Sequence, residues 1–306
     1  MKKSNLLKLI TTAGLLCLSM AVSATTPPPP VDCPSCTGYQ KGPNPTESAL
    51  LANSGPYSVS STSVSSFVSG FGGGHIHYPT NAEANDTFGA IAAVPGYLSY
   101  ESSIEWWGPR LASHGFIVIT IDTNSTSDQP DSRARQLSAA LNHLISESNS
   151  SSSEISGMVD SNRVAVIGWS MGGGGALKLS TDRQLNATIP QAPYYSGRND
   201  FDEISSPTLI IACEDDSVAA VRSHASPFYN DIPRSTPKAF VEINGGSHYC
   251  ANSGYADEDI LGKYGIAWMK RWVDFDERYT QFLCGPNHEG DRDISEWRDS
   301  CSTAQF

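Results

Sequence analysis

Short apolar runs alternate with helical patterns along this chain, and that alternation limits the fold more than any other feature. Short, mainly apolar or β-branched runs predict strands at residues 87–94, 116–121, 164–167, 208–212 and 240–243. Helical spacing predicts helices at residues 102–113, 131–148, 172–179 and 259–279. Strands that alternate with helices predict an α/β fold, in which helices cover both faces of a mostly parallel central sheet.

Two further segments refine this prediction. Residues 71–78 are Gly-rich and then alternate, which predicts a turn and an edge strand. Residues 190–206 join two successive strands, and so short a connection leaves no room for a separate lid domain. We therefore expect an open site without a lid.

The N-terminus has the pattern of a secretory signal peptide. A basic start precedes an apolar run too short to span a membrane, and Val22-Ser23-Ala24 offers small residues for cleavage. A lipoprotein signal at Cys17 is disfavoured because Leu16 directly precedes it, where a small residue would be expected. We expect a secreted protein that passes through the periplasm, with a signal peptide at 1–24, a proline-rich tail at 25–44 and one catalytic domain at 45–306.

The charge of the chain excludes some partners. Its formal net charge is −12, and removal of residues 1–24 takes away three lysines and no acid, which leaves −15. So acidic a surface argues against nucleic acid or an anionic membrane as the partner. We expect a monomer whose partner is a polymeric or small ester.

Six cysteines remain after residue 24, and an even number in an exported chain predicts disulfides. They are Cys33, Cys36, Cys213, Cys250, Cys284 and Cys301. The pair Cys33 and Cys36 lacks both a second CxxC and a nearby histidine. A local disulfide or a feature of the tail is therefore favoured over a metal or redox site.

The pentapeptide Gly168-Trp169-Ser170-Met171-Gly172 follows an apolar strand and precedes a Gly-rich helix. This is the context of a nucleophile elbow, a turn so tight that glycines must flank the serine. The elbow presents the serine Oγ at the top of the sheet, where the helix N-terminus favours negative charge. Ser170 is therefore the predicted nucleophile, and the alternative is a Gly-rich turn without chemistry.

A serine hydroxyl needs a base, and His248 is the predicted one among seven histidines. It follows a predicted strand and the turn Asn244-Gly245-Gly246-Ser247, where this fold delivers its base. The acid comes between the serine and the histidine in chain order. Glu214, Asp215 and Asp216 all follow the strand before it, and spacing alone does not separate Asp216 from Asp215.

The predicted oxyanion hole uses two backbone N–H groups. One belongs to Met171, and the loop Pro95-Gly96-Tyr97 after a buried strand supplies the other from Tyr97. The ring of Tyr97 is also a candidate wall of the cleft, with a packed loop aromatic as the alternative. Asp122 ends a strand but precedes the serine, so we expect a structural or helper role for it.

Seven runs of residues match one known family. They are Gly96-Tyr97, Ser103-Ile104-Glu105-Trp106-Trp107-Gly108-Pro109-Arg110-Leu111-Ala112-Ser113-His114-Gly115-Phe116, Thr120-Ile121-Asp122-Thr123-Asn124, Gly168-Trp169-Ser170-Met171-Gly172-Gly173-Gly174, Gln191-Ala192-Pro193, Ala212-Cys213-Glu214-Asp215-Asp216-Ser217 and Gly245-Gly246-Ser247-His248. In these runs the sequence resembles the bacterial secreted cutinase-like polyester hydrolases, which include poly(ethylene terephthalate) hydrolases. The resemblance covers about residues 45–302.

The resemblance implies an α/β-hydrolase fold and a triad of Ser170, Asp216 and His248, which selects Asp216 among the acids. It also implies Tyr97 and Met171 as oxyanion donors. The side chains that it places around a shallow cleft are Tyr97, Trp169, Tyr194, Val218 and Tyr249. The disulfides that it implies are Cys213–Cys250 and Cys284–Cys301.

Two cleft residues depart from the family pattern. Tyr194 stands where many members carry tryptophan, so a smaller ring remains for stacking. Tyr249 stands where some efficient polyester-degrading members have a small serine, so one side of the cleft is bulkier. The acidity of the chain and Cys33 and Cys36 also lie outside the match.

The expected reaction is two-step acyl transfer on carboxylic esters through an acyl-enzyme, without a metal or an organic cofactor. An open site suits cutin-like or synthetic polyesters. The alternative enzyme is a lidless esterase or lipase of small soluble esters or triglycerides. The non-enzyme alternative is an inactive hydrolase fold that serves as a binding module, which an intact triad disfavours.

Overall fold

The computed structural model describes residues 39–83, 85–197, 201–254, 258–285, 288 and 291–302. The chain divides into two units, residues 1–33 and 34–306, and every described residue belongs to the second unit. The predicted signal peptide, most of the proline-rich tail, Cys33 and Cys36 lie outside the described residues.

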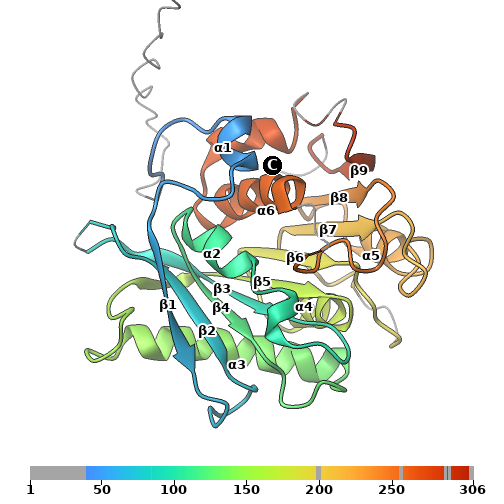
Figure 1. The fold of residues 1–306 in the computed structure, drawn as a ribbon. Coiled ribbons are helices and arrows are strands. Elements are labelled where there is room, and N and C mark those ends of the chain that lie inside the picture. The colour runs from blue at the N-terminus through green and yellow to red at the C-terminus, as the bar shows by residue number, and fades with distance from the viewer. Residues whose placement is uncertain are drawn as a thin grey trace, which may run out of the picture. The chain divides into compact units, whose positions relative to one another are not determined.

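Within the described residues, nine strands form one sheet in the order β1-β2-β4-β3-β5-β6-β7-β8-β9 (Figure 1). The strands are β1 (Val59–Val64), β2 (Gly74–Pro79), β3 (Phe88–Val94), β4 (Phe116–Ile121), β5 (Val159–Trp169), β6 (Ala187–Gln191), β7 (Thr208–Cys213), β8 (Lys238–Ile243) and β9 (Ile294–Asp299). The α-helices are α1 (Glu47–Leu51), α2 (Trp107–Ala112), α3 (Pro130–Ser148), α4 (Met171–Asp182), α5 (Ala225–Asp231) and α6 (Glu258–Val273). The 3₁₀ helices are η1 (Glu101–Ser103) and η2 (Glu277–Phe282).

The centre of the sheet is parallel, which confirms the predicted fold class. Strands β4, β3, β5, β6, β7 and β8 pair in parallel. The strands β1, β2 and β9 pair antiparallel. The prediction of an edge strand at residues 71–78 is wrong, because β2 pairs with β1 on one side and β4 on the other. The true edge is β1, whose polar sequence VSSTSV carries no apolar signal.

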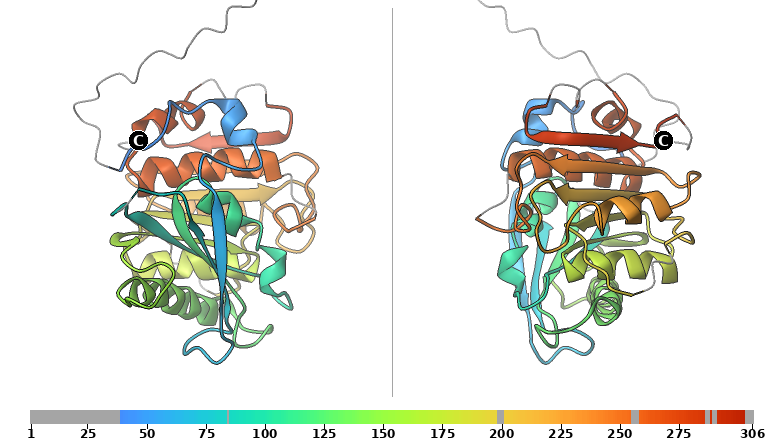
Figure 2. Two further views of the ribbon diagram at one scale, coloured as in Figure 1. Left: turned by 60° about the vertical axis from the view of Figure 1, so that its left-hand side comes forward. Right: turned by 90° about the vertical axis from the view of Figure 1, so that its right-hand side faces the viewer.

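Alternate residues of the central strands face two helical layers. Ile91 and Ala93 of β3 join the core beneath α2 and α6, whereas Ala90 and Ala92 join the core beneath α3 and α4. The helices α6 and α3 accordingly lie on opposite sides of the sheet (Figures 1 and 2). None of the described helices is long and apolar enough to cross a membrane.

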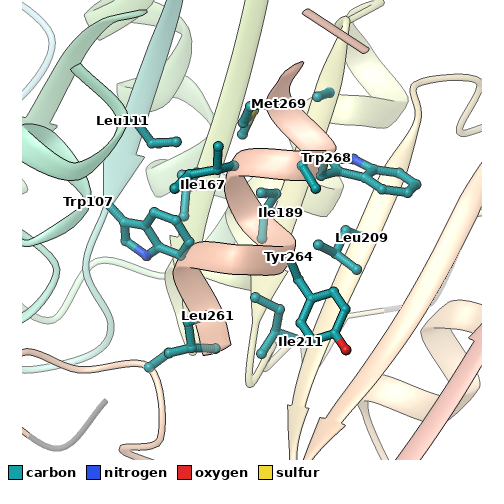
Figure 3. Close-up of a cluster of buried hydrophobic side chains, with 14 of the residues drawn as sticks. Trp107, Leu111, Ile167, Ile189, Leu209, Ile211, Leu261, Tyr264, Trp268 and Met269 are labelled. Atoms are coloured by element: carbon teal, nitrogen blue, oxygen red, sulfur yellow. The ribbon is translucent and has the colours of Figure 1, made fainter. Parts of the chain in front are cut away.

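The core beneath α6 joins that helix to α2 and the central strands (Figure 3). Trp107 of α2 and Trp268 of α6 are fully buried there, against Ile167 of β5 and Ile189 of β6. Burying a large apolar side chain contributes about 1.5 to 3 kcal/mol. This layer therefore fixes the central strands, and with them the loops that follow their C-terminal ends.

Two predicted helices end or break earlier than expected. The predicted helix at 102–113 divides into η1 and α2, because Pro109 is tolerated only in the first turn of a helix and so fixes the start of α2. The predicted helix at 259–279 ends at Val273. Phe275 there has a left-handed backbone with φ of 54°, which no helix accommodates.

Residues 39–44, assigned from the sequence to the tail, contact the folded unit. The guanidinium of Arg163 lies 3.9 Å from the centre of the Tyr39 ring. Arg278 donates hydrogen bonds of 3.2 Å to the carbonyls of Lys41 and Gly42. Contacts with the folded unit therefore extend to residues before Pro45.

We expect Asp274→Asn to cost far more stability than Asp160→Asn. Asp274 is buried, and its carboxylate accepts from both Arg163 and Lys270 at 2.7 Å. The substitution removes the carboxylate that both buried cations share, which costs about 3 to 5 kcal/mol. Asp160 binds the same Arg163 at 3.0 Å but is more exposed, so its loss should cost about 1 kcal/mol or less. Urea unfolding measures both free energies, and equal losses would contradict the prediction.

Candidate active site

Ser170 stands in a turn that has no space for neighbouring side chains. Its backbone has φ of 57° and ψ of −119°, a conformation that non-glycine residues rarely adopt. An added Cβ at Gly168 would lie 2.1 Å from the carbonyl oxygen of Gly172, and one at Gly172 would lie 2.5 Å from the carbonyl oxygens of Val94 and Pro95. The two glycines are therefore required by close backbone approach.

Ser170, His248 and Asp216 form one chain of hydrogen bonds. The Nε2 of His248 lies 2.9 Å from Ser170 Oγ, and its Nδ1 lies 2.7 Å from Asp216 Oδ2. All three residues are buried, with exposed fractions of 5–6%. With the proton on Nδ1 donated to the carboxylate, Nε2 is free to accept the serine proton, which is the arrangement that acyl transfer requires.

The carboxylate of Asp216 is held ionised by its surroundings. Burial raises the pKa of Asp216, but hydrogen bonds from His248 and from the N–H groups of Val218 and Ala219 outweigh it. Those two N–H groups donate to Oδ1 at 2.8 and 2.7 Å. The pKa of Asp216 therefore lies below its ordinary value, and Oδ2 remains an acceptor for His248.

The three candidate acids have different surroundings. Only Asp216 contacts His248. The carboxylate of Glu214 instead accepts the N–H of Gly245 at 2.8 Å. Asp215 is exposed, and its backbone N–H donates to the carbonyl of Gly246 at 2.8 Å. The loop geometry thus places one of three consecutive acids on the histidine.

A disulfide joins the loop of the acid to the loop of the base. Cys213 ends β7, three residues before Asp216, and it is bonded to Cys250, two residues after His248, with Cα atoms 6.0 Å apart. The second disulfide, Cys284–Cys301, lies in the C-terminal segment and closes 17 residues. Both pairs agree with those that the resemblance implies.

Aromatic residues surround the triad in two layers. The ring of Trp169, expected to wall the cleft, is only 2% exposed and lies 5.3 Å from the ring of His248. Its Nε1 donates to the carbonyl of His248 at 2.9 Å, so it supports the histidine loop from within. Tyr97, Val218 and Tyr249, which the resemblance places around the cleft, are exposed by 44%, 57% and 48%.

One neighbour of the site was missed by the sequence analysis. The His224 ring lies 4.8 Å from that of the half-buried Tyr194 and 5.7 Å from that of Phe228. Burial lowers the pKa of His224, so the ring is neutral at neutral pH. No local pattern marks this histidine; its position in the loop after Asp216 was the only available signal.

Asp122 has a structural role at the upper edge of the sheet. Its Oδ1 accepts the backbone N–H of Glu101 at 2.7 Å. The buried Glu101 carboxylate in turn binds His75 Nδ1 at 2.9 Å and the hydroxyl of Thr120. In the described part of the chain, no three His, Cys, Asp or Glu side chains gather into a group that could hold a metal ion.

The parallel sheet, the serine elbow and the buried Ser-His-Asp chain define an α/β-hydrolase. Comparison with known proteins gives the family. A family model described as PET hydrolase-like matches residues 34–302. The chain belongs to this family, and it is a carboxylic ester hydrolase.

Several characterised relatives are similar over most of the chain. A cutinase of Thermobifida fusca (strain YX) is 48% identical over 295 residues, which cover 95% of this chain and 93% of the relative. Cutinase 1 of Thermobifida cellulosilytica is 51% identical over 266 residues, covering 86% and 98%. A bis(hydroxyethyl) terephthalate hydrolase of Streptomyces coelicolor is 48% identical over 265 residues, covering 86% and 82%.

We expect loss of the Cys213–Cys250 disulfide to loosen the site before the fold. The bridge closes 37 residues, so the chain-entropy treatment gives about 3 to 4 kcal/mol of stabilisation as an upper figure. In Cys213→Ser with Cys250→Ser, activity should fade on warming below the temperature of global unfolding. Activity and circular dichroism against temperature measure the two transitions.

The matched control is Cys284→Ser with Cys301→Ser, which removes a bridge far along the chain from the triad. It should lower the melting temperature while activity and fold disappear together. Coincident transitions in the Cys213/Cys250 variant would show that its bridge does not hold the triad.

Proposed function

We propose that this protein hydrolyses polyesters, cutin-like or synthetic ones such as poly(ethylene terephthalate), through an acyl-enzyme on Ser170. The carrying observation is the hydrogen-bonded chain from Ser170 through His248 to Asp216. Ser170 Oγ attacks the ester carbonyl while His248 Nε2 takes its proton and Asp216 stabilises the imidazolium. His248 then protonates the leaving alcohol, and water hydrolyses the acyl-enzyme by the same proton path.

The negative oxygen that develops in each step is assigned to the backbone N–H groups of Met171 and Tyr97. Met171 opens α4 directly after the nucleophile. The Tyr97 loop approaches Ser170 closely, because a Cβ added to Gly96 would lie only 2.9 Å from the Cβ of Ser170. Fixed N–H donors at this position stabilise the tetrahedral intermediate without reorganisation.

The surface around the triad supports a polymeric substrate. Among the described residues, most of the exposed large hydrophobic side chains lie on loops beside the site; they are Tyr97, Leu98, Tyr100, Val218 and Tyr249. Exposed large hydrophobic side chains on neighbouring loops are typical of a binding face. No described residue between β6 and β7 forms a helix that could serve as a lid.

The proposal includes a secreted monomer. Disulfides persist in oxidising compartments, and this chain holds two in its described residues. All three members of the triad come from one chain, so the site needs no second subunit.

The test is incubation of the mature protein with cutin, an aliphatic polyester film and a poly(ethylene terephthalate) film, with identification of released products. Acids and their monoesters should be released from polyester, and Ser170→Ala should lower the rate on the order of 10⁴-fold or more. Hydrolysis of soluble p-nitrophenyl esters without release from any polymer would favour the small-ester alternative. Retained turnover in Ser170→Ala would refute the nucleophile.

Asp216→Asn should cost on the order of 10³- to 10⁴-fold in kcat, because an amide cannot hold His248 in the required tautomer. Asp215→Asn is the matched control, since it changes the adjacent exposed acid. That variant should stay within about threefold of wild type. Steady-state kinetics on a soluble ester measure both, and a larger loss in Asp215→Asn would move the acid's role to that residue.

A further inference from the structure

Arg133 on α3 is a fully buried cation whose described contacts are all backbone carbonyls. Its exposed fraction is 0%. Its Nη1, Nη2 and Nε each donate one hydrogen bond of 2.9 Å, to the carbonyls of Pro95, Thr126 and Asp128 respectively. The described residues give it no carboxylate partner within ion-pair distance, because the Asp128 carboxylate instead accepts from Gln136 and Ser125.

A second buried arginine is held in a different way. Arg163, which is 2% exposed, is paired with both Asp160 and Asp274. A buried charge without a counter-ion costs stability that a paired one largely recovers. Burial lowers the pKa of Arg133 to about 10, with Asp128 opposing, so the guanidinium still carries its charge at neutral pH.

Arg133 is linked to the chain on both sides of the Tyr97 amide, directly through Pro95 and indirectly through Thr126. Pro95 precedes that amide by two residues, and its carbonyl accepts from Nη1. Leu98 follows it, and the Leu98 N–H donates at 2.8 Å to the carbonyl of Thr126, the same carbonyl that accepts from Nη2. One planar guanidinium therefore fixes the start and the end of the Gly96-Tyr97 segment.

The Gly-rich start of α4 brings Arg133 to this position. A Cβ added to Gly175 would lie 2.9 Å from the Cβ of Arg133, so α3 packs directly on that glycine. Gly172, one turn earlier, meets the carbonyl of Pro95 in the same way. Arg133 thus lies at the junction of the Tyr97 loop and the helix that supplies the Met171 N–H.

We propose that Arg133 is a positioning residue that sets the Tyr97 N–H in the oxyanion hole. The inference rests on the proposed ester hydrolysis at Ser170. A lysine or methionine at position 133 cannot hold three carbonyls in one plane, so the Tyr97 loop would lose its fixed orientation. Because the oxyanion forms only in the transition state, this loss lowers kcat and leaves KM nearly unchanged.

The experiment compares Arg133→Lys and Arg133→Met with wild type, using kcat per active site counted by a serine-reactive phosphonate. We expect kcat per site to fall roughly 10- to 100-fold with KM within about threefold, in line with the loss of an aligned oxyanion donor. Affinity for an arylboronic acid, whose tetrahedral adduct on Ser170 occupies the oxyanion hole, should fall in parallel.

Arg163→Lys is the control for a merely structural role. It disturbs a similarly buried guanidinium on β5, seven residues before Ser170. It should lower the melting temperature while kcat per titrated site stays within about twofold. Arg133 variants that show this same pattern would overturn the proposal.

Gly175→Ala keeps the proposal testable if the Arg133 variants do not fold. Its methyl group would lie 2.9 Å from the Cβ of Arg133 and 3.0 Å from the carbonyl of Pro130, so it shifts α3 and Arg133 with it. We expect kcat per site to fall at least threefold at constant KM. An unchanged kcat would overturn the proposal. Wild-type protein without ester hydrolysis would refute the proposed function and this inference together, whereas active wild type with unaffected variants refutes the inference alone.

Discussion

The crowding of the turn between β5 and α4 is the constraint on which the rest of the site depends. No side chain fits at Gly168 or Gly172, so the backbone must pass through a left-handed serine. That conformation is strained and persists only where surrounding contacts determine it. Here they do: the N–H of Ser170 donates to Gln191, and its carbonyl accepts from Gly174 and Tyr194.

The remaining residues of the site follow the C-terminal ends of parallel strands, which lie on the same side of the sheet. β3, β5, β7 and β8 all end there, and the loops after them carry Tyr97, Ser170, Asp216 and His248 respectively. A different interaction holds each of three loops. The Arg133 guanidinium donates to the loop of Tyr97, and the Trp169 indole donates to the loop of His248. A disulfide joins the loops of the acid and the base. Catalytic side chains need such support, because misplacement by about 1 Å can cost two orders of magnitude in rate.

Buried charge has a different role at Arg163, which lies on β5 seven residues before Ser170. There Arg163 meets two carboxylates, so its charge is neutralised where it lies. Arg133, near the loop of Tyr97, donates hydrogen bonds only to backbone carbonyls. A paired charge serves the fold, whereas one solvated by three loop carbonyls fixes the loops to which those carbonyls belong.

The sequence predicts those strands and turns in which the burial or backbone conformation of a residue follows from its immediate neighbours in the chain. β4 lies at residues 116–121 as predicted, because five of its six residues are large and apolar and have no alternative to burial. β1 and β9 were missed because their sequences, VSSTSV and ISEWRD, are polar and pair through backbone at the edges. The nucleophile elbow can be predicted from the sequence because its tight turn requires glycines on both sides of the serine.

The rest of the site depends on contacts that no local pattern records. Spacing cannot distinguish Asp215 from Asp216, since the choice is made by the Val218 and Ala219 N–H groups that hold one carboxylate toward His248. Arg133 lies in a helical pattern where an arginine ordinarily faces solvent. Its burial follows only from the way α3 packs on Gly175 of a helix that is distant in the chain.

Burial also separates the two tasks of the proposed function. The triad residues are 5–6% exposed, and the buried Trp169 indole supports the loop of the base. The residues predicted to line the cleft, Tyr97, Val218 and Tyr249, are about half exposed, so their side chains retain rotamer freedom in water. Hydrolysis requires fixed distances, whereas a polymer chain arrives in many conformations. A rigid buried triad beneath adaptable exposed walls meets both requirements, because each wall can move without displacing the hydrogen bonds below it.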